Sequence, residues 1–343
     1  MTEITADITG GTGVQIVTVS EDDDEIRLDK WFARHFPGLP KTQLYKMMRK
    51  GDVRVAGKRV KPNARVQEGQ EVRVPPMPES AYQPFETRDT YSNEQRQKDK
   101  EFLKSCLIYQ DKHVFVFNKP FGVATQGGSK IKHHIDGALR AFETDTVKPK
   151  LVHRLDKETT GVLVVAKNAK VARDLGYCFK QRETEKYYWA VVCPSPQMEA
   201  GVIEAHIAKG KTRGGERVMV DNEEGKYSKT EYWVVERAYT KAAFICFKPE
   251  TGRTHQLRVH ASIIGCPILG DQKYFIENEH EEQDIDMSVL EHANKLHLHA
   301  RQIKMPHPSG QGMLDVTAAI PEHMANTFKY FEFDENAAED IEE

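Results

Sequence analysis

The run VLVVA (residues 162–166) constrains the fold of this 343-residue chain more than any other stretch. An uninterrupted apolar run of this length, rich in β-branched residues, is typical of a buried strand. The segment before it, HRLDKETTG (residues 153–161), ends in Thr-Thr-Gly, which is typical of a turn. The pattern therefore places Arg154 and Asp156 at the mouth of a buried strand.

A carboxylate in that position needs a partner, because burying an unpaired charge costs free energy. Asp156 is therefore either one half of a structural ion pair or a carboxylate that does chemical work. These nine residues alone favour the structural pair, since ion-pair networks also perturb carboxylates. The wider sequence decides between the two interpretations.

Strand-like runs dominate the chain from residue 106 onward, in the segments LIYQDKHVFVFNKP, KYYWAVV, KTEYWVVERA and AAFICFKP. Helical spacing of apolar residues appears mainly in NAKVARDLGYCFKQR (residues 168–182) and in residues 254–264. Strands that do not alternate regularly with helices favour an α+β fold over a parallel α/β fold. We therefore predict a domain over residues 106–331, built on a mixed, mostly antiparallel sheet.

Residues 26–76 form a smaller unit with its own pattern. IRLDKWFARHF and KTQLYKMMRKG show helical spacing, Gly51 suits a helix C-terminus, and DVRVAGKRV reads as strand, turn, strand. The unit carries 13 Lys or Arg residues against four acidic residues. So large an excess of positive charge on a small unit favours binding of phosphate groups over a merely solvated surface.

The overall net charge of −3 hides an uneven distribution. Residues 1–25, 277–291 and 332–343 each hold seven acidic residues and no Lys or Arg, so the rest of the chain has a net charge of +18. We expect disordered acidic tails at 1–25 and 332–343, a charged linker at 77–105, and dispensable acidic ends. The basic remainder indicates a polyanionic partner.

Several classes of protein find no support in the sequence. No apolar run approaches the length of a membrane span, and the first residues lack the features of a secretory signal. Five widely spaced cysteines fit reduced thiols in a cytoplasmic protein rather than a disulfide framework. The histidines around 255–260 and 292–299 lack the spacing of a metal site, and no phosphate-binding glycine loop or nucleophile elbow is present.

Four ordered motifs resemble those of the RluA family of RNA pseudouridine synthases. They are NKPFGV (118–123), HRLDKETTGVLVVAK (153–167), KYYWA (186–190) and TGRTHQLRVH (251–260), followed by KLHLHARQIKMPHP. Residues 27–75 resemble an S4 domain, an RNA-binding module found in several RNA enzymes and ribosomal proteins. The resemblance covers most of the chain except the acidic ends, the linker and the acidic insertion at 277–291.

The resemblance assigns roles to four residues of the larger domain. Asp156 would be the catalytic carboxylate, and Arg258 would pair with it. Arg154 would hold the target nucleotide out of the RNA helix, and Tyr188 would stack on the flipped base. An aromatic core strand is the competing interpretation of Tyr188, but strand alternation places it on the opposite face from Tyr187 and Trp189.

In the S4 domain the resemblance implies an RNA-facing surface that includes Lys41, Arg49, Lys50, Arg54 and Lys58. Thr160 departs from the family pattern, which usually has Ser there, but it keeps the hydroxyl. Lys119 and Pro120 are expected to shape the cleft rather than to react.

The reaction implied by the resemblance detaches uracil from C1′ and rejoins it through C5, so it requires no cofactor and no metal. It needs an ionised carboxylate at the ribose, an extruded base and a flat surface to hold the base. The sequence leaves open whether Asp156 attacks C1′ or removes the proton at C2′.

The S4 stretch, the GGS at 127–129 and the motif around Asp156 most resemble the RluC subtype, which acts on large-subunit (23S) ribosomal RNA. The alternatives are an RluD-type enzyme, an enzyme of transfer RNA, and a non-enzymatic ribosome-assembly protein that binds RNA. We expect a monomer.

Overall fold

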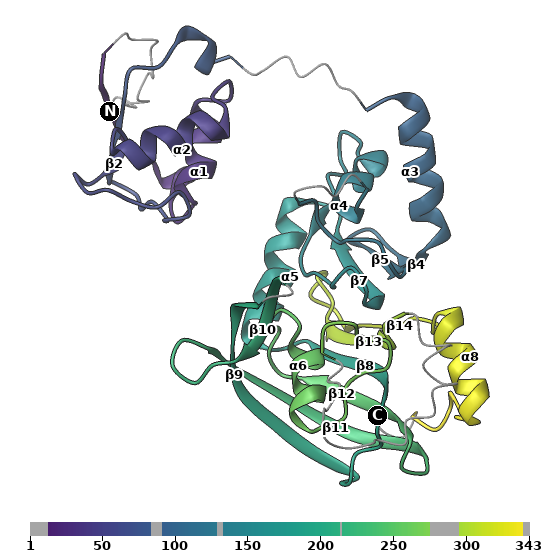
Figure 1. The fold of residues 1–343 in the computed structure, drawn as a ribbon. Coiled ribbons are helices and arrows are strands. Elements are labelled where there is room, and N and C mark those ends of the chain that lie inside the picture. The colour runs from purple at the N-terminus through teal and green to yellow at the C-terminus, as the bar shows by residue number, and fades with distance from the viewer. Residues whose placement is uncertain (1–12, 84–90, 129–132, 213–214, 275–294, 339–343) are drawn as a thin grey trace. The chain divides into compact units, whose positions relative to one another are not determined.

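The computed structural model describes residues 13–83, 91–128, 133–212, 215–274 and 295–338. The chain divides into two compact units, Met1–Ser92 and Asn93–Glu343 (Figure 1). Among the described residues, no helix is both long enough and apolar enough to cross a membrane.

The first unit packs two helices against a small antiparallel sheet. Its elements are β1 (Gln15–Thr18), η1 (Glu21–Asp23), α1 (Leu28–His35), α2 (Lys41–Lys50), β2 (Arg54–Val55), β3 (Glu71–Val74) and η2 (Glu79–Ala81), with the strand order β1-β3-β2. Leu28, Trp31 and Phe32 of α1 are fully buried, as their helical spacing predicts. Gly51 ends α2 in the left-handed conformation at φ 83°, so its predicted role as a helix C-cap is confirmed.

The expected disordered tail at residues 1–25 is wrong for residues 15–25. Strand β1 pairs with β3, and Val17 and Val19 lie in the core of the unit. The acidic cluster is held in place because Asp23, which is buried, accepts from Arg34 and lies 2.5 Å from Nε2 of His35. Alternating valines and basic partners on α1 therefore order a segment whose composition alone indicated disorder.

The second unit is built on one large sheet in the order β10-β9-β11-β12-β8-β13-β7-β5-β4, with β14 on β13 and β6 on β7. Its strands are β4 (Leu107–Gln110), β5 (Val114–Lys119), β6 (Lys150–Leu151), β7 (Thr160–Ala166), β8 (Glu185–Val192), β9 (Ala200–Thr212), β10 (Gly215–Val220), β11 (Lys226–Ala238), β12 (Ala242–Pro249), β13 (Leu298–Pro306) and β14 (Met313–Thr317). Its helices are α3 (Asn93–Ser105), α4 (Ile135–Ala138), η3 (Leu139–Phe142), α5 (Ala169–Gln181), α6 (Gln256–Ile263) and α8 (Glu322–Phe331). The pairing of β7 with β13 is parallel and the other described pairings are antiparallel, so the predicted α+β fold is confirmed.

Strand β7 lies at the centre of the core. All seven of its residues are buried, and residues 162–166 alternate between two apolar clusters on opposite faces of the sheet. Val162 and Val164 pack toward α5, whereas Leu163 and Val165 pack toward α3 and α4. A run that is apolar at every position is needed because both faces of this strand are covered.

The second unit extends beyond both of its expected boundaries. Helix α3 occupies residues expected to be linker, and its Leu103 is fully buried against β5 and β7. At the other end, Phe333 and Ala338 pack into the cluster around Phe244 and Phe328. The expected acidic tail at 332–343 is therefore wrong for residues 332–338, because one aromatic residue anchors it. Residues 1–12 and 339–343 of the expected tails and the insertion 277–291 lie outside the described residues.

We predict that Gly161→Ala lowers the free energy of unfolding by about 3 kcal/mol or more. Gly161 has φ 107°, and a Cβ atom there would lie 2.2 Å from the carbonyl oxygen of Ala300 on β13. Gly176→Ala is the matched control, because a Cβ atom on this exposed position of α5 meets nothing within 4 Å. Urea unfolding should show the control as stable as the wild type, or more stable by up to about 1 kcal/mol. Equal stability of Gly161→Ala and the wild type would contradict the account of the β7–β13 contact.

Candidate active site

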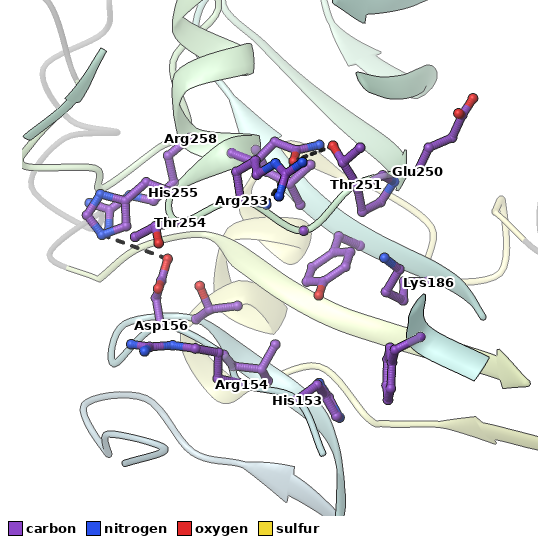
Figure 2. Close-up of a pocket in the computed structure, with 18 of the residues that line it drawn as sticks. His153, Arg154, Asp156, Lys186, Glu250, Thr251, Arg253, Thr254, His255 and Arg258 are labelled. Carbon is purple, nitrogen blue, oxygen red and sulfur yellow. Dashed lines mark hydrogen bonds and ion pairs between the residues drawn. The ribbon is translucent and has the colours of Figure 1, made fainter. Parts of the chain in front are cut away.

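A pocket of about 530 Å³ opens where the loop before β7, strand β8 and the start of α6 meet. The loop contributes Arg154 and Asp156, β8 contributes Tyr188, and α6 contributes Arg258. The structure thus brings together all four side chains that the sequence nominated. In Figure 2 the Asp156 carboxylate points across the pocket toward His255.

Buried polar groups hold the loop that carries Asp156. The Thr125 hydroxyl donates to the Leu155 carbonyl at 2.7 Å and accepts from the Leu155 N–H at 3.1 Å. Fully buried Lys119 donates through Nζ to the carbonyls of Pro120, Val123 and Lys157, at 3.0, 2.8 and 3.2 Å. Backbone on both sides of Asp156 is therefore tied to the loop after β5.

Lys119, near Asp156, has a perturbed pKa. Burial lowers the pKa of its ammonium group to about 7, while the nearby Asp156 opposes that shift. The three carbonyl acceptors also favour the charged form. These contacts support the expected structural role of Lys119 in shaping the cleft.

Tyr188 lies on the pocket side of β8. Its neighbours Tyr187 and Trp189 are buried in the cluster on the other face, with Phe244 and Phe328, as strand alternation predicts. Burial raises the pKa of the Tyr188 hydroxyl, and the charge of Asp156 raises it further. Tyr188 is therefore a neutral, partly buried ring at the edge of the cavity.

Among the described residues, Arg258 and Asp156 do not form the expected ion pair, so this prediction is wrong. Arg258 instead binds Asp271 through two hydrogen bonds of 2.7 Å, and its third nitrogen lies 3.0 Å from Glu158. Asp271 is also buried and accepts from the N–H groups of Lys273 and Tyr274. The planar guanidinium thus makes a bidentate interaction with Asp271. The negative charge of Asp156 only adds to the effects of Asp271 and Glu158 that raise the pKa of Arg258.

Sequence reasoning missed His255, which it treated as structural. Its Nε2 atom lies 3.9 Å from Oδ2 of Asp156, closer than any Lys or Arg side chain in the described ion pairs. Its backbone is left-handed at φ 53° as the residue that precedes α6. Its place beside Arg258 in TGRTHQLRVH was the signal available in the sequence.

The residues that line the pocket carry a net positive charge. Six Lys or Arg residues contribute to it, against the two acidic residues Asp156 and Glu250. Arg154 is exposed at the rim and forms no ion pair with another described residue. Burial and, to a smaller extent, the positive charge of Arg182 lower the pKa of Lys186 to about 8. Such a lining suits a phosphate backbone outside and a neutral base inside.

The five basic residues nominated in the first unit are all exposed. Lys41, Arg49 and Lys50 lie on α2, Arg54 on β2 and Lys58 in the turn that follows. Arg54 donates to the carbonyls of Gly51 and Gly57, so it also supports that turn. Across the described ranges, no group of three His, Cys, Asp or Glu residues is arranged to hold a metal ion.

We predict that Arg258→Met lowers the free energy of unfolding by about 3–5 kcal/mol, because it leaves the Asp271 carboxylate buried without a positively charged partner. The double variant Arg258→Met/Asp271→Leu should be clearly more stable than Arg258→Met alone. Chemical unfolding of the three proteins checks this. Equal losses in the single and double variants would show that the ion pair does not account for the effect.

Comparison with known proteins agrees with this geometry. Residues 113–262 match the RNA pseudouridylate synthase family, and residues 26–72 match the S4 domain. The chain is 34% identical over 314 residues to Ribosomal large subunit pseudouridine synthase C of Vibrio vulnificus (strain CMCP6), covering 91% of this chain and 95% of that protein. It is 34% identical over 312 residues to the protein of the same name from Escherichia coli (strain K12), covering 90% and 94%.

A solved structure extends the similarity to the fold. Human RNA Pseudouridylate Synthase Domain Containing 4 aligns with a TM-score of 0.57 and 28% sequence identity, covering 69% of this chain and 96% of that chain. The expectation drawn from the four motifs and the S4 stretch is confirmed. The chain belongs to the RluA family of RNA pseudouridine synthases, is similar to the RluC subtype, and carries an N-terminal S4 domain.

Proposed function

We propose that this enzyme converts specific uridines of large-subunit (23S) ribosomal RNA to pseudouridine, with Asp156 as its catalytic carboxylate. The observation that carries the proposal is the position of Asp156, which is partly exposed and lines a basic pocket. The similarity to two relatives named for the ribosomal large subunit supports the choice of RNA.

In the proposed reaction, the bond between N1 and C1′ breaks and a bond between C5 and C1′ forms. Asp156 acts at the ribose while the uracil is detached. The hydrogen on C5 leaves to solvent and N1 regains a proton, so atoms balance without an oxidant or a cofactor. Whether Asp156 bonds to C1′ or takes the C2′ proton stays open.

The other pocket residues divide the remaining tasks. Arg154, exposed and unpaired among the described residues, would fill the space that the extruded nucleotide leaves in the RNA. The Tyr188 ring would support the detached base, because a neutral aromatic face binds a flat base by stacking. Arg258 would act through the field it creates at Asp156 and through its hold on Glu158 and Asp271.

The first unit is proposed to supply RNA affinity rather than chemistry. Its expected range of 26–76 gains support from the S4 match at 26–72, and its core also includes Val17, Met77 and Ala81. We propose a contact surface on α2 and the following turn, made of Lys41, Arg49, Lys50, Arg54 and Lys58. We further propose that the enzyme is a monomer and that it acts in the cytoplasm. The free thiols of its five cysteines support the cytoplasmic location.

Asp156→Asn should abolish turnover while RNA binding persists, because the change removes one charge and keeps the shape of the side chain. The measurement is tritium release from unmodified large-subunit ribosomal RNA transcripts labelled at uracil C5. Asp145→Asn, on an exposed loop outside the pocket, is the matched control and should release tritium at the wild-type rate. Wild-type release from transfer RNA alone would redirect the substrate assignment. No release from any RNA would overturn the proposed function.

Replacing Lys41, Arg49, Lys50 and Lys58 with Gln in the full chain should weaken RNA binding and flatten its dependence on salt. Each lost phosphate contact reduces the logarithmic salt slope by about 0.7–0.9. Filter binding between about 50 and 200 mM salt measures the slope. The control replaces Arg96, Lys98, Lys100 and Lys104 on α3 with Gln, which removes the same four positive charges. An equal slope in both variants would contradict the proposed RNA surface.

A further inference from the structure

Tyr274 connects the candidate active site to a hairpin of the sheet. It is 2% exposed, and its hydroxyl oxygen lies 3.0 Å from the N–H of Val218 on β10 and 2.8 Å from Nδ1 of His255. His255 in turn presents its other ring nitrogen to Asp156, at 3.9 Å. Tyr274 thus contacts the candidate carboxylate only through His255.

The hydrogen bonds of Tyr274 favour one of the two neutral tautomers of His255. The backbone N–H of Val218 can only donate, so the Tyr274 oxygen accepts there. The single hydroxyl hydrogen of Tyr274 is then free to be donated to Nδ1 of His255. A neutral imidazole whose Nδ1 accepts must carry its hydrogen on Nε2, the atom that faces Asp156.

The charges around these two rings support that arrangement. Burial raises the pKa of Tyr274, so its hydroxyl keeps the proton it donates. The guanidinium carbons of Arg217 and Arg258 lie 4.7 and 5.2 Å from the centre of the Tyr274 ring, which polarises the hydroxyl as a donor. Burial lowers the pKa of His255, so the ring is neutral near pH 7 and its tautomer matters.

We propose that Tyr274 and His255 act as a positioning relay that directs an N–H donor toward the Asp156 carboxylate. This inference rests on the proposed role of Asp156. The present distance of 3.9 Å is longer than a hydrogen bond, and a movement of about 1 Å closes it. Catalytic hydrogen bonds often shorten in this way when substrate binds. The relay holds the carboxylate ionised and oriented.

The relay makes a specific prediction for pH dependence. Without the Tyr274 hydroxyl, His255 is free to place its lone pair on Nε2, which repels an ionised carboxylate. The ionised carboxylate is then less stabilised, so the acid limb of the kcat profile moves to higher pH. Among the described residues, the other charged or titratable groups that face the His255 ring are Arg258 on α6 and Asp271 and Lys273 in the turn before residue 275.

Tyr274→Phe tests the relay, because it removes only the hydroxyl. We expect kcat for tritium release from the ribosomal RNA transcript to fall about tenfold, with KM changed less than about twofold and the acid limb shifted upward. Tyr187→Phe is the matched control, since it removes another buried hydroxyl, on the opposite face of β8, and should retain wild-type kcat.

A double-mutant cycle separates the relay from simple loss of structure. In a His255→Leu background, Tyr274→Phe should cause no further loss of kcat. Equal losses in both backgrounds would assign the effect to the Val218 contact and overturn the relay. An unchanged kcat in Tyr274→Phe would also overturn the relay. The proposed function would still stand in that case, because it depends on turnover by the wild-type enzyme.

His255→Gln keeps the test decisive if Tyr274→Phe fails to fold. The glutamine amide places an N–H group near the position of Nε2 and needs no tautomer control. His255→Gln should therefore retain more activity than His255→Leu and keep the acid limb close to that of the wild type. Equal kcat and equal pH profiles in the two His255 variants would contradict the proposal.

Discussion

The buried ion pair between Arg258 and Asp271 is the interaction on which the candidate active site depends. It joins the first turn of α6 to the turn that ends at Tyr274. The third guanidinium nitrogen of Arg258 pairs with Glu158 on the loop that carries Asp156. Both side chains are almost fully buried, so each charge requires the other. Three segments are thereby fixed around one pocket, and one of them, the loop with Glu158, is far from the other two in the sequence.

The sheet supplies the second constraint. Strand β7 is covered on both faces, and its close parallel approach to β13 requires a glycine at 161. The loop before it therefore ends at a rigid edge, where Thr125 and Lys119 fix the backbone around Asp156. A carboxylate held by its backbone can remain partly exposed to substrate without being consumed in a structural ion pair. This arrangement supports the proposal that Asp156 of the HRLDKETTG segment is a working carboxylate.

Much of this arrangement could be predicted from the sequence, because it depends on local patterns. The apolar run of β7, the helical spacing of α5 and the alternation that separates Tyr188 from Tyr187 all follow from strand and helix periodicity. The partner of Arg258 could not be predicted, since Asp271 lies 13 residues away with a turn between them. The His255–Tyr274 contact depends on a left-handed backbone at 255 that no local pattern announces. Composition misjudged both acidic ends, because a few apolar residues such as Val17 and Phe333 decide whether a charged segment packs.

The enzyme is proposed to isomerise uridines of large-subunit ribosomal RNA in the pocket around Asp156. The most direct measurement is nucleoside analysis of unmodified transcripts of large-subunit, small-subunit and transfer RNA after incubation with the purified enzyme. Pseudouridine has the same mass as uridine but separates from it by chromatography and in its fragmentation. We expect new pseudouridine in the large-subunit transcript, amounting to a few nucleotides per molecule, with an equal loss of uridine. Pseudouridine confined to transfer RNA, or none in any transcript, would contradict it.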